Sequence, residues 1–200
     1  NIGKALPNIK TSVQATKASL ENLNLLQTGR GEIAFTLGDS LSDAWKVKEE
    51  AGFKAPLNKL RGIAAIYPNY IQIVARADSG IRTLADLKGK RISAGAPRSG
   101  TELNARTIFE AAGITYKDFS KVEYLPFGES VELMKNRQRA VTLQSAGLVV
   151  ASLRDLATSV DIVVVPIPAD VVKKTNDPAY IAATIRANTY KGQAADVVSA

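Results

Sequence analysis

Short apolar, β-branched runs alternate with amphipathic helical patterns along this chain, and that alternation constrains the fold more than any other feature. In the first half, β-like segments at 9–16 and 32–37 precede helical patterns that begin near Ser19 and Asp39 and stop at Gly29 and near Gly52. A β-α-β-α order is typical of helices packed on a mostly parallel sheet. The sequence therefore predicts an α/β fold.

The same alternation continues to the C-terminal part of the chain. Further strands are predicted at 62–67, 70–75, 91–95, 122–125, 141–144, 161–165 and 181–185, and further helices at 83–89, 101–112, 130–137, 148–157 and 169–174. Because β-α units occupy both halves, we place a lobe boundary within 93–96, where a crossing strand would act as a hinge. This boundary divides the chain into lobe I (1–94), lobe II (95–190) and the start of a return to lobe I (191–200).

The amino-acid composition limits the kinds of catalysis and metal binding that this chain can support. The 200 residues include no histidine and no cysteine. This excludes Ser-His-Asp and Cys-His catalysis and metal sites built on imidazole or thiolate. We expect a binding protein rather than an enzyme, with no cofactor and no metal. The sequence has no stretch of eighteen apolar residues, so we also expect no direct insertion into a membrane.

The charge balance favours a small anionic partner over nucleic acid. The formal net charge is +7, but lysine and arginine are scattered singly among acidic residues, and aromatic residues make up only 6% of the chain. Nucleic-acid-binding proteins usually cluster their basic residues and interleave them with aromatic ones. A positive surface also attracts small anions.

The most informative motif is Gly95-Ala-Pro-Arg-Ser-Gly-Thr101, which follows a predicted strand and begins a predicted helix. The first N–H groups of such a helix and the positive end of its dipole favour a bound anion. The glycine spacing resembles a phosphate-binding P-loop, but Thr101 follows Gly100 directly, without the intervening lysine. A carboxylate therefore fits better than a nucleotide. The alternative is a turn that only caps the helix.

Polar residues occupy other predicted strand-to-helix junctions as well. Thr16, Ser19 and Asn22 form one, Asp39 forms another, and Gln144 begins a third. Ligands of open α/β sheets bind beyond the carboxyl ends of the strands, so these junctions could share one cleft. Tyr67 could form a wall of that cleft or belong to the core. Taken singly, each junction is also explained by ordinary helix capping.

Several short motifs occur together along nearly all of the chain, namely DSGI at 78–81, LADLKGKR at 84–91 and GxxxSGT at 95–101, with ASLENL at 18–23, YLPF at 124–127 and VVVPIP at 163–168. With these motifs the chain resembles the TAXI family, the extracytoplasmic receptors of TRAP transporters. Two departures from the family pattern are Leu37-Gly38-Asp39, where a Gln-Ser-Asp type of sequence is common, and Arg139-Ala140, where an acidic residue usually precedes the alanine.

This resemblance implies a two-lobed, type II periplasmic binding protein-like fold, incomplete at both ends of this chain. It implies a periplasmic receptor that captures a small carboxylate (glutamate, glutamine or a dicarboxylate) and delivers it to the membrane subunits of a TRAP transporter. The ligand-lining residues that it implies are Thr16, Ser19, Asn22, Asp39, Tyr67, Ser99, Gly100, Thr101 and Gln144.

Two alternative functions stay open. An enzyme of the same two-lobed fold, such as a deaminase or a transferase acting on an anionic substrate, would need Asp39, Glu21, Glu102 or a buried lysine as its acid or base. The effector part of a transcription regulator would need a DNA-binding helix-turn-helix upstream of these residues.

Overall fold

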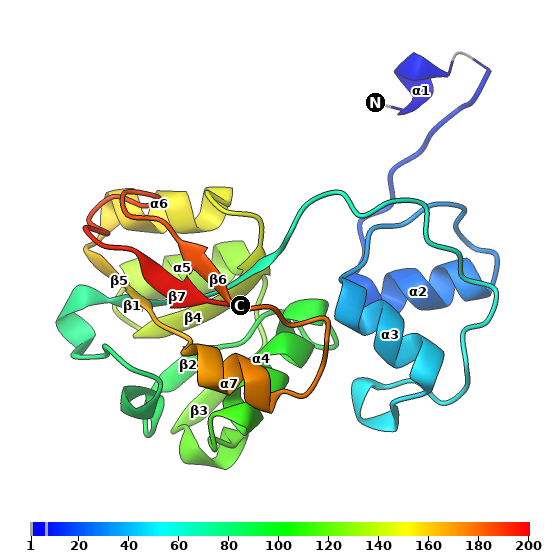
Figure 1. The fold of residues 1–200 in the computed structure, drawn as a ribbon. Coiled ribbons are helices and arrows are strands. Elements are labelled where there is room, and N and C mark those ends of the chain that lie inside the picture. Colours follow the sequence, from blue (N-terminus) through cyan, green and yellow to red (C-terminus); the bar gives the residue numbers. More distant parts are fainter. Residues whose placement is uncertain (1, 7) are drawn as a thin grey trace.

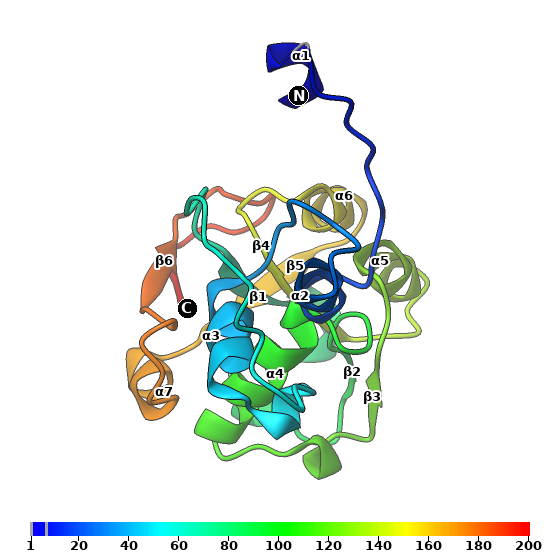
Figure 2. The ribbon, with the colours of Figure 1, turned by 90° about the vertical axis from the view of Figure 1, so that its right-hand side faces the viewer.

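The computed structural model describes residues 2–6 and 8–200, which form two units joined by an extended segment (Figure 1). The smaller, helical unit (residues 16–60) contains α2 (Ser19–Gln27), α3 (Gly38–Lys46) and the short 3₁₀ helix η1 (Glu49–Ala51). The larger, sheet unit comprises residues 70–200. Residues 61–69 connect the two and are all exposed. The first helix, α1 (Ile2–Ala5), lies apart from both units (Figures 1 and 2).

Five strands form the central sheet of the sheet unit. Their spatial order is β3 (Lys121–Glu123), β2 (Arg91–Ser93), β4 (Val141–Ala146), β1 (Tyr70–Arg76) and β5 (Ile162–Val165). β2 pairs in parallel with β3 and with β4, whereas β1 runs antiparallel to both β4 and β5. The strands β2, β3, β4 and β5 therefore all point the same way.

Helices cover both faces of this sheet (Figure 1). On one face, α4 (Gly100–Ala111) and α7 (Ala169–Lys174) pack over the strands, and on the other face lie α5 (Phe127–Lys135) and α6 (Ala151–Ser159). The helix positions that repeat every three or four residues supply the buried contacts, as in α4, where Ala105, Ile108 and Phe109 are all buried. Two apolar cores result, one on each side of the sheet.

A two-stranded hairpin closes the sheet unit. β6 (Ala183–Ile185) pairs antiparallel with β7 (Val197–Ser199). The Ile71 N–H donates to the carbonyl of Ala200 at 2.8 Å, and the Ser199 hydroxyl donates to the carbonyl of Ile71 at 2.7 Å. Residues 191–200 therefore stay in the sheet unit, rather than beginning a return to an N-terminal lobe as predicted.

The predicted boundary at residue 94 also differs from the structure. β1 and β2 precede that boundary, yet both hydrogen-bond with β4 in one continuous sheet. The chain passes between its two units at 61–69 instead. Sequence alternation alone cannot show this, because a β-α unit has the same pattern whichever sheet it joins.

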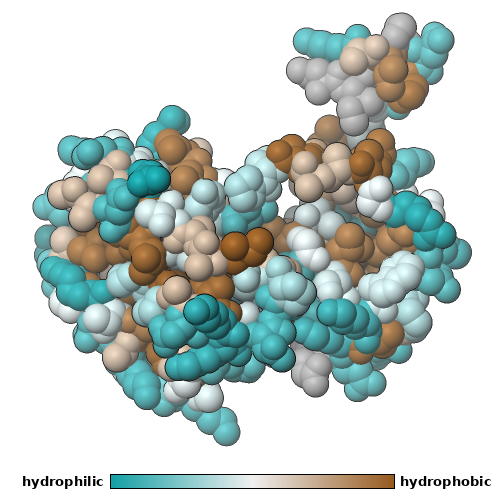
Figure 3. Space-filling view, in the orientation of Figure 1, coloured by the Kyte–Doolittle hydropathy of each residue, from teal (hydrophilic) through white to brown (hydrophobic). Residues whose placement is uncertain are grey.

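Three segments predicted as strands are not strands in the structure, namely 9–16, 32–37 and 62–67. Val13 is 100% exposed, Phe35 72% and Ile63 79%. β-Branched residues favour an extended backbone, but a strand also needs a neighbour for its hydrogen bonds. The described residues supply none here. Figure 3 shows hydrophobic residues at the surface on the upper side of the helical unit.

The remaining connections include short 3₁₀ turns at η2 (Ala77–Ser79), η3 (Ala85–Leu87) and η4 (Tyr116–Asp118). The helix predicted at 83–89 is reduced to η3. Its start is held by the Asp86 carboxylate, which accepts from the N–H groups of Arg82 and Thr83 at 3.0 and 2.8 Å.

Candidate ligand site where the two units meet

The parallel strands of the sheet end at a common edge. There β2 leads into α4 through residues 94–99, β3 leads into α5 through 124–126, and β4 leads into α6 through 147–150. Parallel pairing of β2 with β3 and β4 places these three corners side by side. The junctions predicted near Ser19 and Asp39 follow no strand, but they start helices of the facing helical unit.

The β2–α4 corner is shaped by steric demands at Gly95 and by a capping serine. Gly95 has φ +85°, and a Cβ atom there would lie 2.7 Å from Cγ2 of Thr101. The Ser99 hydroxyl caps α4 by accepting from the N–H of Glu102 at 3.2 Å. Ser99 and Thr101 are buried, with exposed fractions of 5% and 6%. Ser99 thus caps the helix, while the N–H groups of Gly100 and Thr101 have no acceptor within the helix.

Gly100 is one of the points at which the two units touch. A Cβ atom on Gly100 would lie 2.5 Å from Cδ1 of Leu37 and 2.8 Å from the hydroxyl oxygen of Ser19. Ser19 is the first residue of α2, Gly100 is the first of α4, and Leu37 is the residue before α3. The N-terminal ends of three helices thus converge on one place. Each carries the positive end of its helix dipole.

The start of α2 is held by side chains rather than by a conventional cap. Ser19 does not cap the helix, and its hydroxyl instead accepts from the N–H of Leu37 at 3.2 Å. The Thr16 hydroxyl donates to the Asn22 side-chain oxygen at 2.6 Å, and the Asn22 amide donates to the carbonyl of Phe35 at 2.7 Å. Thr16 and Asn22 therefore bind each other and tie the segment before α3 to α2.

Asp39 bridges the two units from the first turn of α3. Its carboxylate accepts from the N–H of Ser40 at 2.7 Å, from the Asn104 amide at 2.5 Å and from the Tyr180 hydroxyl at 2.8 Å. Burial raises the pKa of Asp39 above its ordinary value, and these hydrogen bonds oppose the shift in part. Burial and the adjacent carboxylate also raise the pKa of Tyr180. With the two units in contact, the Asp39 carboxylate is occupied by hydrogen bonds from Ser40, Asn104 and Tyr180.

The two other predicted residues, Tyr67 and Gln144, lie near the β4–α6 corner, but their side chains do not face a common site. The Tyr67 ring is 63% exposed and lies 3.6 Å from where a Cβ on Gly147 would be. Gln144 is completely buried under α6, where its side-chain oxygen accepts from the Ser152 hydroxyl at 2.6 Å. Its side-chain nitrogen is buried without a partner in the described structure. Gln144 thus points into the sheet unit rather than toward the helical unit.

The structure therefore brings together Ser19, Asp39 and the Ser99–Thr101 corner, with Thr16 and Asn22 beside them, and leaves Tyr67 and Gln144 separate. Sequence analysis missed Asn104 and Tyr180. Asn104 lies one turn after Gly100 on α4, so helical spacing could have indicated it. No sequence signal indicates Tyr180, which reaches Asp39 from the loop after α7.

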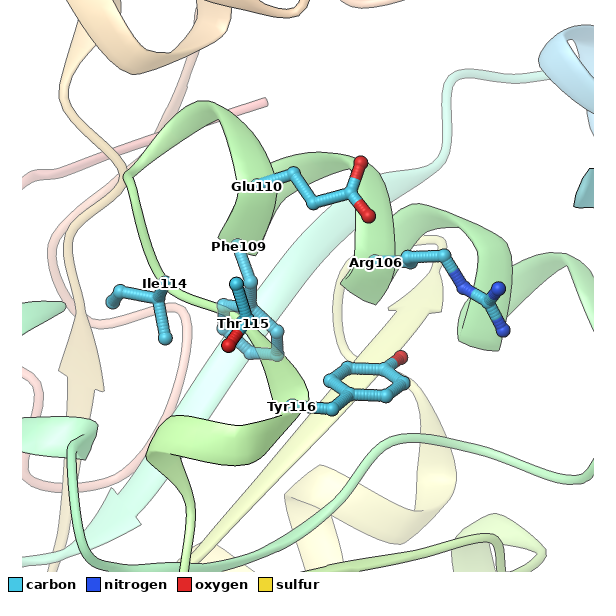
Figure 4. A pocket seen from close by; sticks show the side chains of 6 residues that line it. All are labelled: Arg106, Phe109, Glu110, Ile114, Thr115 and Tyr116. Atoms are coloured by element: carbon cyan, nitrogen blue, oxygen red, sulfur yellow. The ribbon is translucent and has the colours of Figure 1, made fainter.

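None of the predicted ligand residues lines either of two hollows in the sheet unit. One, of about 190 Å³, lies beside the C-terminal half of α4, between Arg106, Phe109 and Tyr116 (Figure 4). The Arg106 guanidinium stacks over the Tyr116 ring at 5.7 Å and donates to Glu102 at 2.7 Å. The other hollow, of about 370 Å³, lies at the opposite edge of the sheet from the corners. At the predicted site itself, Leu37 fills the contact between the units.

Residues 2–6 and 8–200 contain no group of three or more histidine, cysteine, aspartate or glutamate side chains placed to hold a metal ion. None of the helices in this part of the chain combines the length and apolar character needed to cross a membrane.

A family model described as "NMT1-like family" matches residues 2–200. Among solved structures, the fold is similar to that of the periplasmic aliphatic sulphonate binding protein SsuA from Escherichia coli, with 18% identity and a TM-score of 0.53. It is equally similar to an ancestral arginine-binding protein bound to arginine, with 17% identity and a TM-score of 0.53. Each match covers 82% of this chain.

These similarities confirm the predicted fold class, the α/β fold of two-lobed periplasmic solute-binding proteins. Both of these structural neighbours are solute-binding proteins. The match covers 49% of the sulphonate-binding protein and 64% of the arginine-binding protein. The chain thus spans about half of the first and under two thirds of the second.

Proposed function

The chain belongs to the NMT1-like family, and from that premise we propose that it forms the solute-binding core of a periplasmic receptor. In this proposal, the helical unit and the sheet unit act as two lobes that close on a small carboxylate, such as glutamate, glutamine or a dicarboxylate. The loaded receptor then delivers the solute to the membrane subunits of a TRAP transporter.

The convergence of three helix N-termini at Gly100 is the observation that carries this proposal. When the lobes separate, Leu37 and Ser19 move away from Gly100, and the unpaired N–H groups at the starts of α2 and α4 become available to a ligand. Oriented N–H groups and the positive ends of helix dipoles stabilise a bound carboxylate without changing it chemically. Ser19, Ser99 and Thr101 add hydroxyl groups to the same place.

Lobe closure also supports a binding role. The lobes are connected by the single exposed segment 61–69, so their relative movement needs no break in the sheet or in the core of either unit. A solute that contacts both lobes shifts the population toward the closed form. The contacts of Asp39 with Asn104 and Tyr180 then hold the closed form from within the protein.

The test is a thermal-unfolding screen of the protein with a panel of carboxylates, alkanesulphonates and arginine. A true ligand at one hundred times its Kd should stabilise the fold by about 2.7 kcal/mol. Glutamate, glutamine or a dicarboxylate should raise Tm. If only sulphonates do so, the carboxylate proposal is wrong. If only arginine does so, the ligand is a cationic amino acid and not glutamate, glutamine or a dicarboxylate, and if the whole panel leaves Tm unchanged, the binding proposal fails.

A single substitution then locates the site. Gly100→Ala should weaken solute binding by at least about tenfold, because its methyl group would overlap Leu37 and Ser19 and keep the lobes from closing. Gly128→Ala is the matched control, since Gly128 lies in the first turn of α5 with no atom within 4 Å of its added Cβ. Equal affinities of the two variants would place the site elsewhere.

Delivery needs its own measurement. In proteoliposomes that contain TRAP membrane subunits, uptake of the identified solute should depend on this receptor in its complete form. The Gly100→Ala variant should reduce that uptake in proportion to its loss of solute binding. Uptake that is independent of the receptor would contradict the transporter assignment.

A further inference from the structure

A cluster of positively charged side chains lies at one edge of the sheet, opposite the edge where the helix N-termini meet at Gly100. The hollow of about 370 Å³ there is bounded by the end of β1, the turn that precedes β2 and the loop between α5 and β4. Five cationic side chains line it, namely those of Arg76, Lys90, Arg91, Arg137 and Arg139. We refer to it as the basic hollow.

Among the residues that the structure describes, two carboxylates pair with these cations. Asp78 accepts two hydrogen bonds from Arg76 Nη2, at 2.8 and 2.7 Å, and Glu123 is bound closely by Arg139. Both carboxylates are thereby engaged, and Glu123 also pairs with Lys121 at 2.8 Å. The cations of the basic hollow therefore exceed the negative charge that faces them.

Three of the five cations remain available to a ligand. Arg91 lies 3.6 Å from Glu123, and its side chain is 49% exposed. Arg137 lies 3.8 Å from Asp78, and its side chain is 79% exposed. For Lys90, no carboxylate lies within 4.0 Å in the part of the chain described. Asp86, whose pKa Lys90 helps to lower, is held mainly by the N–H groups of Arg82 and Thr83.

The backbone at Arg137 supplies an independent observation. Arg137 follows α5 with φ 58°, a left-handed conformation that glycine adopts most easily at the end of a helix. A side chain at such a position costs free energy, and strained positions of this kind cluster at functional sites. The distant pair with Asp78 is too long for a hydrogen bond and offsets little of that cost. A ligand bound in the hollow would explain why an arginine stands there.

We propose that the basic hollow binds a phosphate group, either of free phosphate or a phosphomonoester or of anionic lipid headgroups. Arginine guanidinium groups match the oxygens of phosphate with paired, charge-assisted hydrogen bonds, and a lysine adds a compact positive charge. Arg91, Arg137 and Lys90 provide these groups. The site is separate from the proposed solute site and lies at the other edge of the same sheet.

The test is calorimetric titration of the protein with inorganic phosphate at low ionic strength, where surface charge is least screened. Arg137→Gly should weaken phosphate binding by about tenfold, the loss expected for one charge-assisted contact. Tm should not fall, because glycine suits the backbone at this position. Adding Lys90→Gln should weaken binding further. Arg154→Gln removes an exposed cation of α6 and is the matched control, which should leave phosphate binding unchanged.

Vesicles distinguish the two sources of phosphate. Binding to vesicles of phosphatidylcholine with phosphatidylglycerol, lost in Arg137→Gly, would support lipid headgroups, whereas binding of inorganic phosphate alone would support a soluble ligand. If the parent protein binds neither, or if Arg137→Gly binds as well as the parent, the proposal is wrong. Gly100→Ala should leave phosphate binding unchanged, so failure at one site is distinguishable from failure at the other.

Discussion

At the scale of single residues, Asp39 shows how burial redirects a polar side chain. An aspartate in the first turn of a helix usually interacts with the N–H groups of its own helix. Here the carboxylate is 7% exposed and holds Asn104 and Tyr180 of the other unit. Its burial is tolerated because donors surround it. The residue therefore links the two units rather than only starting α3.

Replacing this carboxylate should weaken the link. Asp39→Asn substitutes an amide donor for one acceptor oxygen and leaves donors of Asn104, Tyr180 and Ser40 competing for a single oxygen. We expect the free energy of unfolding to fall by about 1–3 kcal/mol, the cost of unpaired buried polar groups. Urea unfolding measures it. Asp170→Asn is the control, because the Asp170 side chain is 66% exposed and should contribute less than about 0.5 kcal/mol.

The Asp39→Asn variant also tests how the free energy of unfolding depends on pH. Since burial raises the pKa of Asp39 in the folded protein above its ordinary value of 3.8, folding favours the protonated form. The contribution of this pKa shift to folding stability is present below the unfolded pKa and is lost as pH rises through the folded pKa. The stability of the parent relative to Asp39→Asn should therefore increase as pH falls from 7 toward 4. A difference that is constant over this range would contradict the raised pKa.

At the scale of elements, the β2–α4 corner depends on a close backbone approach. Gly95 has φ +85° and faces Thr101 across the turn, while Ser99 caps the helix that follows. These features direct the start of α4 toward the helical unit. The motif at 95–101 predicted this strand-turn-helix geometry correctly, because each of its residue types has a local role.

A side chain at Gly95 should disrupt this corner. Gly95→Ala combines an unfavourable φ with a Cβ placed 2.7 Å from Thr101, so we expect a loss of at least about 2 kcal/mol in the free energy of unfolding. Gly113→Ala separates the two effects, because Gly113 has φ +70° with no atom within 4 Å of the added Cβ. That control should cost about 1 kcal/mol. Equal losses would show that crowding at Thr101 contributes nothing.

At the scale of the whole molecule, the two units differ in how they are held together. The sheet unit has an apolar core on each face of its sheet, whereas the helical unit packs a small core that Leu103 of α4 completes. The connection at 61–69 has no secondary structure and is exposed throughout. The units therefore depend on each other at one contact surface only.

Limited proteolysis tests the division of the chain into a helical unit and a sheet unit. Exposed backbone outside secondary structure is cut before the strands and helices of a stable core. Trypsin should cut first at Lys10, Lys17 and Arg61, and a fragment that begins at Gly62 should persist, since it contains the whole five-stranded sheet. Mass spectrometry identifies the cuts. Early cleavage between 70 and 165 would contradict the division into these units.

The sequence by itself determined the features that depend on neighbours along the chain. Helical periodicity predicted helices in the regions of α2 to α7, and the β2–α4 corner could be read from its glycines and Ser99. The alternation of strands and helices predicted the α/β class. These features follow from backbone geometry and from which face of each element is apolar.

Only the tertiary structure decided the rest. The segments at 9–16, 32–37 and 62–67 have strand-like composition, but pairing depends on a distant neighbour that local sequence does not specify. The assignment of β1 and β2 to the same sheet as β4, and the meeting of Asp39 with Tyr180, likewise join residues far apart in the chain. Local preferences restrict the backbone of each segment, whereas hydrogen-bond pairing and burial depend on which segments come together in space.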